Sequence, residues 1–170
     1  MSRSIRLEKT YPHPPAKVWK AVTSSAALAE WLMENDFRPE VGHEFQFRTE
    51  PAPGFDGIVN CRVLAIEEER RLSFTWVGGP VDTVVTWTLE PVAAGTRFVF
   101  EQTGFEGFHA GFVSFILESG SRKIYNKMLP DLLARMGPDG SIAGEPMDPD
   151  CEGGGLWRVL ARIGGLIFRH

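Results

Sequence analysis

The feature that most constrains the fold is a repeated alternation of apolar and polar residues between positions 43 and 102. Apolar side chains at every second position give an extended strand one core-facing side and one solvent-facing side. Short turn-forming stretches interrupt the alternation, so it predicts five consecutive strands with tight connections, which is typical of an antiparallel meander. The predicted strands are 43–49, 57–67, 72–76, 85–89 and 97–102.

The segment before this meander predicts one more strand and two short helices. Residues 3–11 alternate in the same way and indicate a half-buried strand. The prolines that follow favour a first helical turn, where a missing N–H breaks no hydrogen bond. We expect helices at 15–22 and 26–33, the second capped by Ser24 or Ser25.

Helical spacing replaces the alternation in the last third of the chain. Apolar residues fall on one broad face over 109–136, which predicts a long helix, and Pro130 predicts a kink or break within it. Residues 137–155 are rich in Gly and Pro and indicate a linker. Residues 156–170 predict a basic amphipathic helix, so the chain divides into a domain over 1–136, a linker and this C-terminal helix.

Composition narrows the class of protein. The 170 residues are 43% hydrophobic with a net charge of −4, which is typical of a globular domain and argues against a nucleic-acid-binding face. Neither a signal peptide nor a membrane-spanning run is apparent. Cys61 and Cys151 allow one disulfide by number, but nothing in the sequence indicates a disulfide framework, so we expect reduced thiols and a cytoplasmic location.

Several local sequences carry a resemblance to a known family. Residues 14–19 resemble the first helix of the helix-grip superfamily, also called START-like, SRPBCC or Bet v-like. Four further stretches are similar to bacterial proteins related to activators of the Hsp90 ATPase: 30–45, 71–76, 85–91 and 95–98. The resemblance implies an α+β helix-grip fold, with a curved antiparallel sheet of about six strands, two short helices and a long C-terminal helix over the concave face.

The resemblance implies three functions that the residues leave open. Many superfamily members bind apolar small molecules between the sheet and the long helix, so we expect non-enzymatic binding of a small apolar or aromatic ligand. One alternative is a stress-related accessory of a chaperone ATPase, and another is a polyketide cyclase-like or hydrolase-like enzyme. A fold alone does not choose among them.

The candidate site is the inward face of the sheet together with the helices that cover it. Twelve Phe and five Trp accompany only two Tyr, and such rings line an apolar cavity or simply fill a core. Gln102 is the polar exception, which needs a partner in the long-helix backbone or in a ligand. The predicted lining is Trp31, Phe45, Phe47, Trp76, Trp87, Phe98, Phe100, Gln102, Phe112, Phe115 and Ile116.

Residues for catalysis or metal binding are few. The four histidines are isolated and lack zinc-ligand spacing, so we expect no metal and no cofactor. His109 is the candidate general base, although it is also an ordinary residue for the start of a helix. The resemblance places a histidine in many relatives where this chain has Gln102, which cannot act as an acid or base and disfavours an enzyme.

The expected partners follow from the same features. They are a small apolar molecule, a chaperone or a second copy of the chain, and no nucleic acid. The helix at 156–170 is expected to dock on its own domain or in a homodimer. Contact with a membrane surface is a less favoured alternative because the segment holds only three arginines, and disorder of the segment is the remaining alternative.

Overall fold

The computed structural model describes residues 3–49, 56–78, 81–105, 121–137 and 140–142. His109, Phe112, Phe115 and Ile116 lie outside the described residues, as do the predicted helix at 156–170 and most of the predicted linker at 137–155. The elements are β1 (Arg3–Tyr11), α1 (Pro15–Thr23), α2 (Ser25–Trp31), β2 (Glu34–Asn35), β3 (Glu44–Arg48), β4 (Ile58–Glu67), β5 (Arg71–Gly78), β6 (Val81–Val92), β7 (Gly95–Phe105), a π-helical turn (Ile124–Met128) and α4 (Leu129–Arg135).

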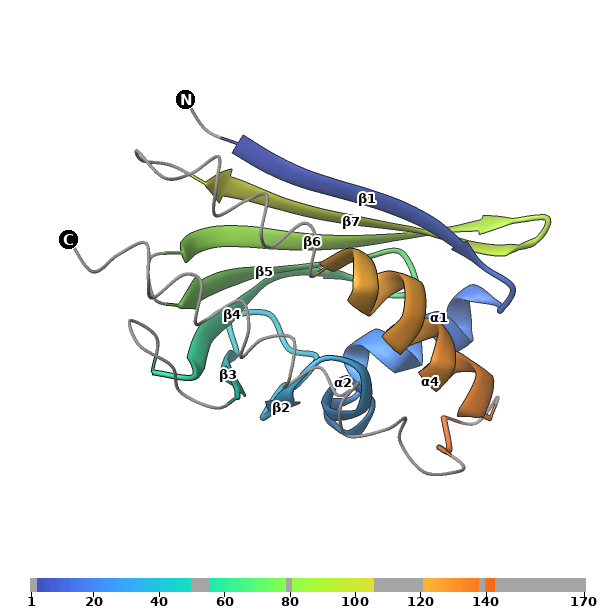
Figure 1. Ribbon diagram of the computed structural model, residues 1–170, viewed down its shortest axis with the longest axis horizontal. Helices are drawn as coiled ribbons and strands as arrows, with labels where there is room; N and C mark the ends of the chain where they lie inside the picture. The colour runs from blue at the N-terminus through green and yellow to red at the C-terminus, as the bar shows by residue number, and fades with distance from the viewer. Residues whose placement is uncertain (1–2, 50–55, 79–80, 106–120, 138–139, 143–170) are drawn as a thin grey trace.

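The described strands form one antiparallel sheet, and the helices lie on one side of it (Figure 1). We call this side the helix-bearing face and the opposite side the outer face. The strand order is β1-β7-β6-β5-β4-β3-β2, so the first strand of the chain lies beside the last. The α+β architecture is the expected one and is consistent with the helix-grip fold.

The sheet has seven strands rather than about six. The additional strand, β2, has two residues, of which Asn35 lies opposite Phe47 of β3. Two residues are too few to show an alternation, so the sequence pattern could not indicate this strand. The alternation elsewhere correctly predicts burial, as in β3, where Phe45 and Phe47 are buried while Glu44 and Arg48 are exposed.

The N-terminal helices begin as predicted, but the second ends earlier. The Ser24 hydroxyl accepts a hydrogen bond from the Ala27 N–H at 3.4 Å and caps α2. The helix ends at Trp31, and Asn35 then donates to the carbonyls of Met33 and Ser25, which fixes the chain as it turns into β2.

The described part of the long helix contains the irregularity that Pro130 predicted. The Leu129 N–H donates to the carbonyl of Ile124, which gives a π-helical turn just before the proline. If this pattern, in which each N–H donates to the carbonyl five residues earlier, continued by one residue, the N–H of residue 130 would donate to the Tyr125 carbonyl. Residue 130 is a proline and has no N–H. The Tyr11 hydroxyl donates to that carbonyl instead, at 2.6 Å, and so ties the end of β1 to the helix.

No helix within the described ranges has both the length and the apolar character of a membrane-spanning segment.

Candidate functional site

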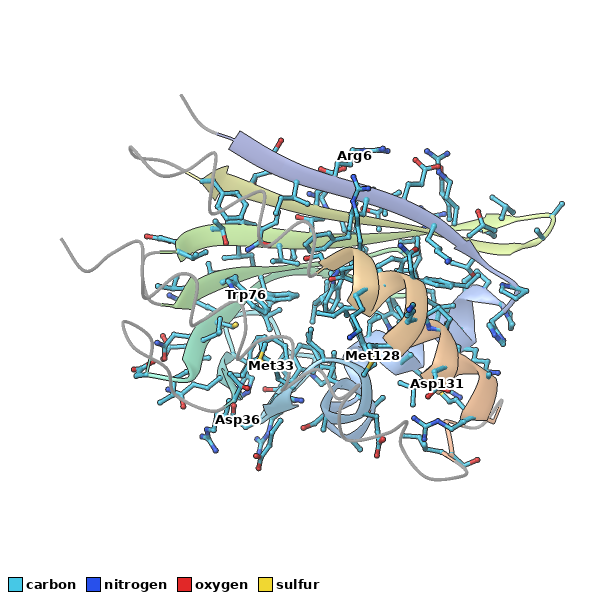
Figure 2. All side chains as sticks on the ribbon, in the orientation of Figure 1. Arg6, Met33, Asp36, Trp76, Met128 and Asp131 are labelled. Atoms are coloured by element: carbon cyan, nitrogen blue, oxygen red, sulfur yellow. The ribbon has the colours of Figure 1, made fainter. Side chains whose placement is uncertain are left out.

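The helix-bearing face holds all the predicted lining residues that fall in the described part of the chain. They are buried, and even the most accessible, Trp76, is only 6% exposed. Figure 2 shows the Trp76 ring over the sheet on the side that carries the helices. The set consists of Trp31, Phe45, Phe47, Trp76, Trp87, Phe98, Phe100 and Gln102.

The rings of this face form a continuous series of contacts across the strands. The ring centroids of Phe47 and Trp76 are 5.4 Å apart, and those of Phe74 and Trp87 are 5.0 Å apart with edge-to-face packing. Trp31 of α2 contacts Trp87 at 5.5 Å. Such pairs add about 0.5–1.5 kcal/mol each beyond the area that they bury, so the ring contacts stabilise this apolar face.

Tyr125 belongs to the same cluster, although the sequence analysis did not identify it. Its ring stacks on Phe100 with a centroid distance of 4.6 Å, and its hydroxyl accepts a hydrogen bond from Trp87 Nε1 at 2.9 Å. Burial raises the pKa of this phenol well above its usual value, which keeps it neutral. The sequence signal was available, because the helical spacing already placed its neighbours Ile124 and Met128 on the buried face.

The polar groups of the helix-bearing face form a short chain across three strands. The Gln102 amide Nε2 donates to Thr83 Oγ1 at 2.8 Å, and this hydroxyl donates to the Trp76 carbonyl at 3.1 Å. The partner of the Gln102 nitrogen is therefore a neighbouring strand, which is neither of the two partners that the sequence suggested.

The interior of the described residues carries no charge. The buried polar side chains are Ser73, Thr83, Thr96, Gln102 and Ser121, all of them neutral. Within those residues, no group of three His, Cys, Asp or Glu side chains is arranged to hold a metal ion. The described interior can therefore exclude water and offer amide and hydroxyl hydrogen bonds, but it contains no buried carboxylate, histidine, lysine or arginine side chain.

Neither of the two described histidines is fully buried, although the His43 ring stacks on that of Phe45 with the centroids 6.2 Å apart. His13 is half-buried beside Lys17, with 3.2 Å between Nδ1 and Nζ. Partial burial and the nearby ammonium lower the pKa of His13. His43 is half-buried as well, and its Nε2 lies 3.1 Å from the carbonyl of Asp36.

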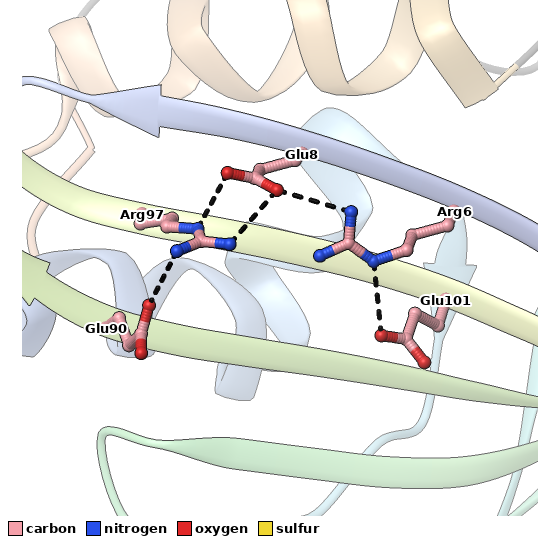
Figure 3. A network of polar contacts seen from close by, with 5 residues as sticks. All are labelled: Arg6, Glu8, Glu90, Arg97 and Glu101. Atoms are coloured by element: carbon pink, nitrogen blue, oxygen red, sulfur yellow. Dashed lines mark hydrogen bonds and ion pairs between the residues drawn. The ribbon is translucent and has the colours of Figure 1, made fainter.

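The outer face carries a network of charges instead of rings (Figure 3). Glu8 of β1 lies 2.7 Å from Arg97 Nε and 3.2 Å from Arg6 Nη1, while Arg97 also reaches Glu90 and Arg6 reaches Glu101. The hydrogen bond from Arg97 is the main cause of a lowered pKa at Glu8, with a further contribution from Arg6. The two faces of the sheet thus differ in chemistry, since one is largely apolar and the other carries exposed ion pairs.

Comparison with known proteins gives a consistent result. Residues 12–128 match the family model described as Activator of Hsp90 ATPase homolog 1-like protein. The crystal structure of MLL2253 from Mesorhizobium loti is 34% identical, with 79% of this chain and 99% of that chain covered and a TM-score of 0.71. The solution structure of BH1534 from Bacillus halodurans is 30% identical, with 76% and 95% covered and a TM-score of 0.66.

A more distant structure shares the fold. DynU16, described as a protein of the dynemicin biosynthetic locus, is 23% identical with a TM-score of 0.63, and the match covers 81% of this chain and 49% of that chain. No curated protein matches the sequence.

Proposed function

Because the chain belongs to the Activator of Hsp90 ATPase homolog 1-like family, we propose that it uses the helix-grip architecture to bind a small apolar or aromatic ligand between the sheet and the long helix, without chemical turnover. The observation that carries this proposal is the neutral polar chain from Gln102 to Thr83 within an otherwise aromatic face. Binding pockets for small molecules are mostly apolar, with a few polar groups that orient the ligand.

The packing favours one end of the helix-bearing face for the ligand. Tyr125 stacks on Phe100 and lies 5.7 Å from Phe98, so rings already occupy the space between the sheet and the π-helical turn. The ligand would lie farther along the strands, toward Trp76 and Gln102. In that position the rings supply burial and the Gln102 amide oxygen accepts one hydrogen bond.

Native mass spectrometry of gently purified protein tests the proposal directly, with denatured protein as the control. A mass excess that disappears on denaturation is expected, and its value identifies the class of ligand.

Binding of a neutral fluorescent probe, N-phenyl-1-naphthylamine, locates the site. Trp76→Ala should weaken binding by at least about tenfold, because it removes a ring of the proposed lining. Trp76→Phe keeps a ring there and should retain most of the affinity. Equal affinity in the wild type and in a folded Trp76→Ala protein would contradict this assignment.

A second candidate function rests on the description of the family itself, which names activation of the Hsp90 ATPase. A chaperone accessory would use an exposed surface, such as the charged outer face, rather than the ring cluster. The two functions separate in an ATPase assay with purified Hsp90: Arg97→Glu should abolish stimulation by an accessory but leave probe binding intact. Enzymatic turnover is the third alternative, and its support is limited to the biosynthetic locus of DynU16.

A cytoplasmic location is proposed on the ground that the buried Cys61 is a free thiol.

A further inference from the structure

A hollow lies beside β1, at the edge of the sheet, where the strand faces the long helix. Its volume is about 210 Å³. We call it the β1 edge groove. It is lined by Leu7, Glu8, Lys9, Phe98, Phe100, Arg122, Tyr125 and Asn126.

Lys9 is the unusual residue of this groove. Ile5 and Tyr11 of β1 are buried on the helix-bearing face. Lys9 lies on their side of the strand, between Leu7 and Tyr11 in the alternation, and is half-buried. In the part of the chain that the structure describes, no hydrogen bond or ion pair engages its ammonium group. Partial desolvation of a cation is unfavourable unless an anion compensates for it.

The carboxylate among the lining residues does not supply that anion. Glu8 is bound to Arg97 and Arg6 on the outer face, with its oxygens 2.7 and 3.2 Å from their nitrogens. Figure 3 shows this arrangement from the outer side. Lys9 and the exposed Arg122 are the cationic side chains among the lining residues, and Asn126 lies on the same helix as Arg122.

The apolar part of the groove consists of buried rings. Phe98, Phe100 and Tyr125 contribute them, and Phe100 and Tyr125 are already stacked on each other. The volume is below the roughly 300–1,000 Å³ of pockets that hold drug-sized ligands, so the groove suits a ligand of about one ring.

We propose that the β1 edge groove binds a small aromatic carboxylate, with the ring against Phe100 and Tyr125 and the carboxylate at the Lys9 ammonium. The charge-assisted hydrogen bond to Lys9 distinguishes this site from the neutral site near Gln102. The two sites lie on different parts of the face and prefer different ligands, so either one can be present without the other.

The test is a titration of the ¹⁵N-labelled full chain with benzoate, followed by NMR, with benzyl alcohol as the uncharged counterpart. Benzoate should shift the backbone amide signals of Lys9 and Asn126 and bind at least about fivefold more tightly than benzyl alcohol. Lys9→Gln should remove this preference, and Lys9→Arg should retain it because the charge remains.

Lys127→Gln is the matched control, since Lys127 is exposed on the same π-helical turn as Tyr125 and Asn126 but does not line the groove. It should leave benzoate binding unchanged. The proposal is overturned if benzoate does not shift the groove signals, if folded Lys9→Gln binds benzoate as tightly as the wild type, or if Lys127→Gln weakens binding as much as Lys9→Gln does.

Discussion

At the scale of single residues, polar atoms on the apolar face are few and the bonds they make are specific. Gln102 donates to Thr83 on the next strand, and Trp87 donates to the hydroxyl of Tyr125. Each bond lies where an unpaired donor would cost about 1–3 kcal/mol. These hydrogen bonds therefore favour one arrangement of the side chains on this face, in addition to any contact that the polar atoms make with a ligand.

Glu8 provides a prediction about pH at the same scale. Its pKa is lowered from 4.5 in the folded protein, chiefly by the hydrogen bond from Arg97. A lowered pKa means that the ionised form stabilises the fold above pH 4.5 and that this contribution is lost as the pH falls through the folded-state value. An NMR titration of the Glu8 side-chain carboxyl carbon should give a midpoint below 4.5, and Arg97→Gln should move it upward. An unchanged midpoint in Arg97→Gln would show that Arg97 is not the cause.

At the scale of elements, the link between β1 and the long helix depends on a missing N–H. Pro130 leaves the Tyr125 carbonyl without a partner from the helix, and the Tyr11 hydroxyl supplies one. Tyr11→Phe keeps the ring that packs 5.8 Å from Phe98 but removes the hydroxyl. The free energy of unfolding, measured in urea, should fall by about 1–3 kcal/mol, because a buried carbonyl is left unpaired.

Pro130→Ala is the second arm of this experiment. It restores an N–H that can donate to the Tyr125 carbonyl, so Tyr11→Phe should cost at least about 0.5 kcal/mol less in this background. Additive effects of the two substitutions would contradict the proposed relation between the proline and the tyrosine.

The same two elements show what sequence patterns can and cannot predict. The bounds of β1 follow from the alternation at 3–11, because a period of two is a local property of the chain. Pro130 likewise predicts an irregular helix, since its effect is local. The bond from Tyr11 to Tyr125 spans 114 residues and depends on how the helix sits on the sheet, so no local pattern contains it.

The candidate site follows the same rule. Burial of Phe45, Trp76 and Phe100 could be predicted from the alternation within single strands. The Thr83 partner of Gln102 requires the register between β6 and β7, and Lys9 became notable only when β1 was found at the edge of the sheet. Whether the predicted lining holds a ligand stays a prediction.

At the scale of the whole molecule, the ring contacts connect strands and helices into one core. Trp19, Trp31, Trp76 and Trp87 are all buried in it. Unfolding should therefore be a single transition, in which the midpoints from tryptophan fluorescence and far-UV circular dichroism coincide. Trp157→Phe removes the one tryptophan outside the described residues, so that the fluorescence reports on the core alone. Two separate midpoints in this variant would mean that part of the sheet unfolds independently.

The pairing of the first strand with the last has a consequence for how this protein is made. Arg6 lies opposite Glu101, so the N-terminal strand leaves the ribosome long before its partner has been synthesised. During that interval β1 has no partner strand for its backbone hydrogen bonds, and Ile5 and Leu7 lack the residues of β7 that lie opposite them. Closing so long a loop is an entropic cost that only the completed β7 can offset, and contacts of such high sequence separation slow folding. The sheet is thus completed only after β7 has been synthesised, by a strand that precedes the other described strands along the chain.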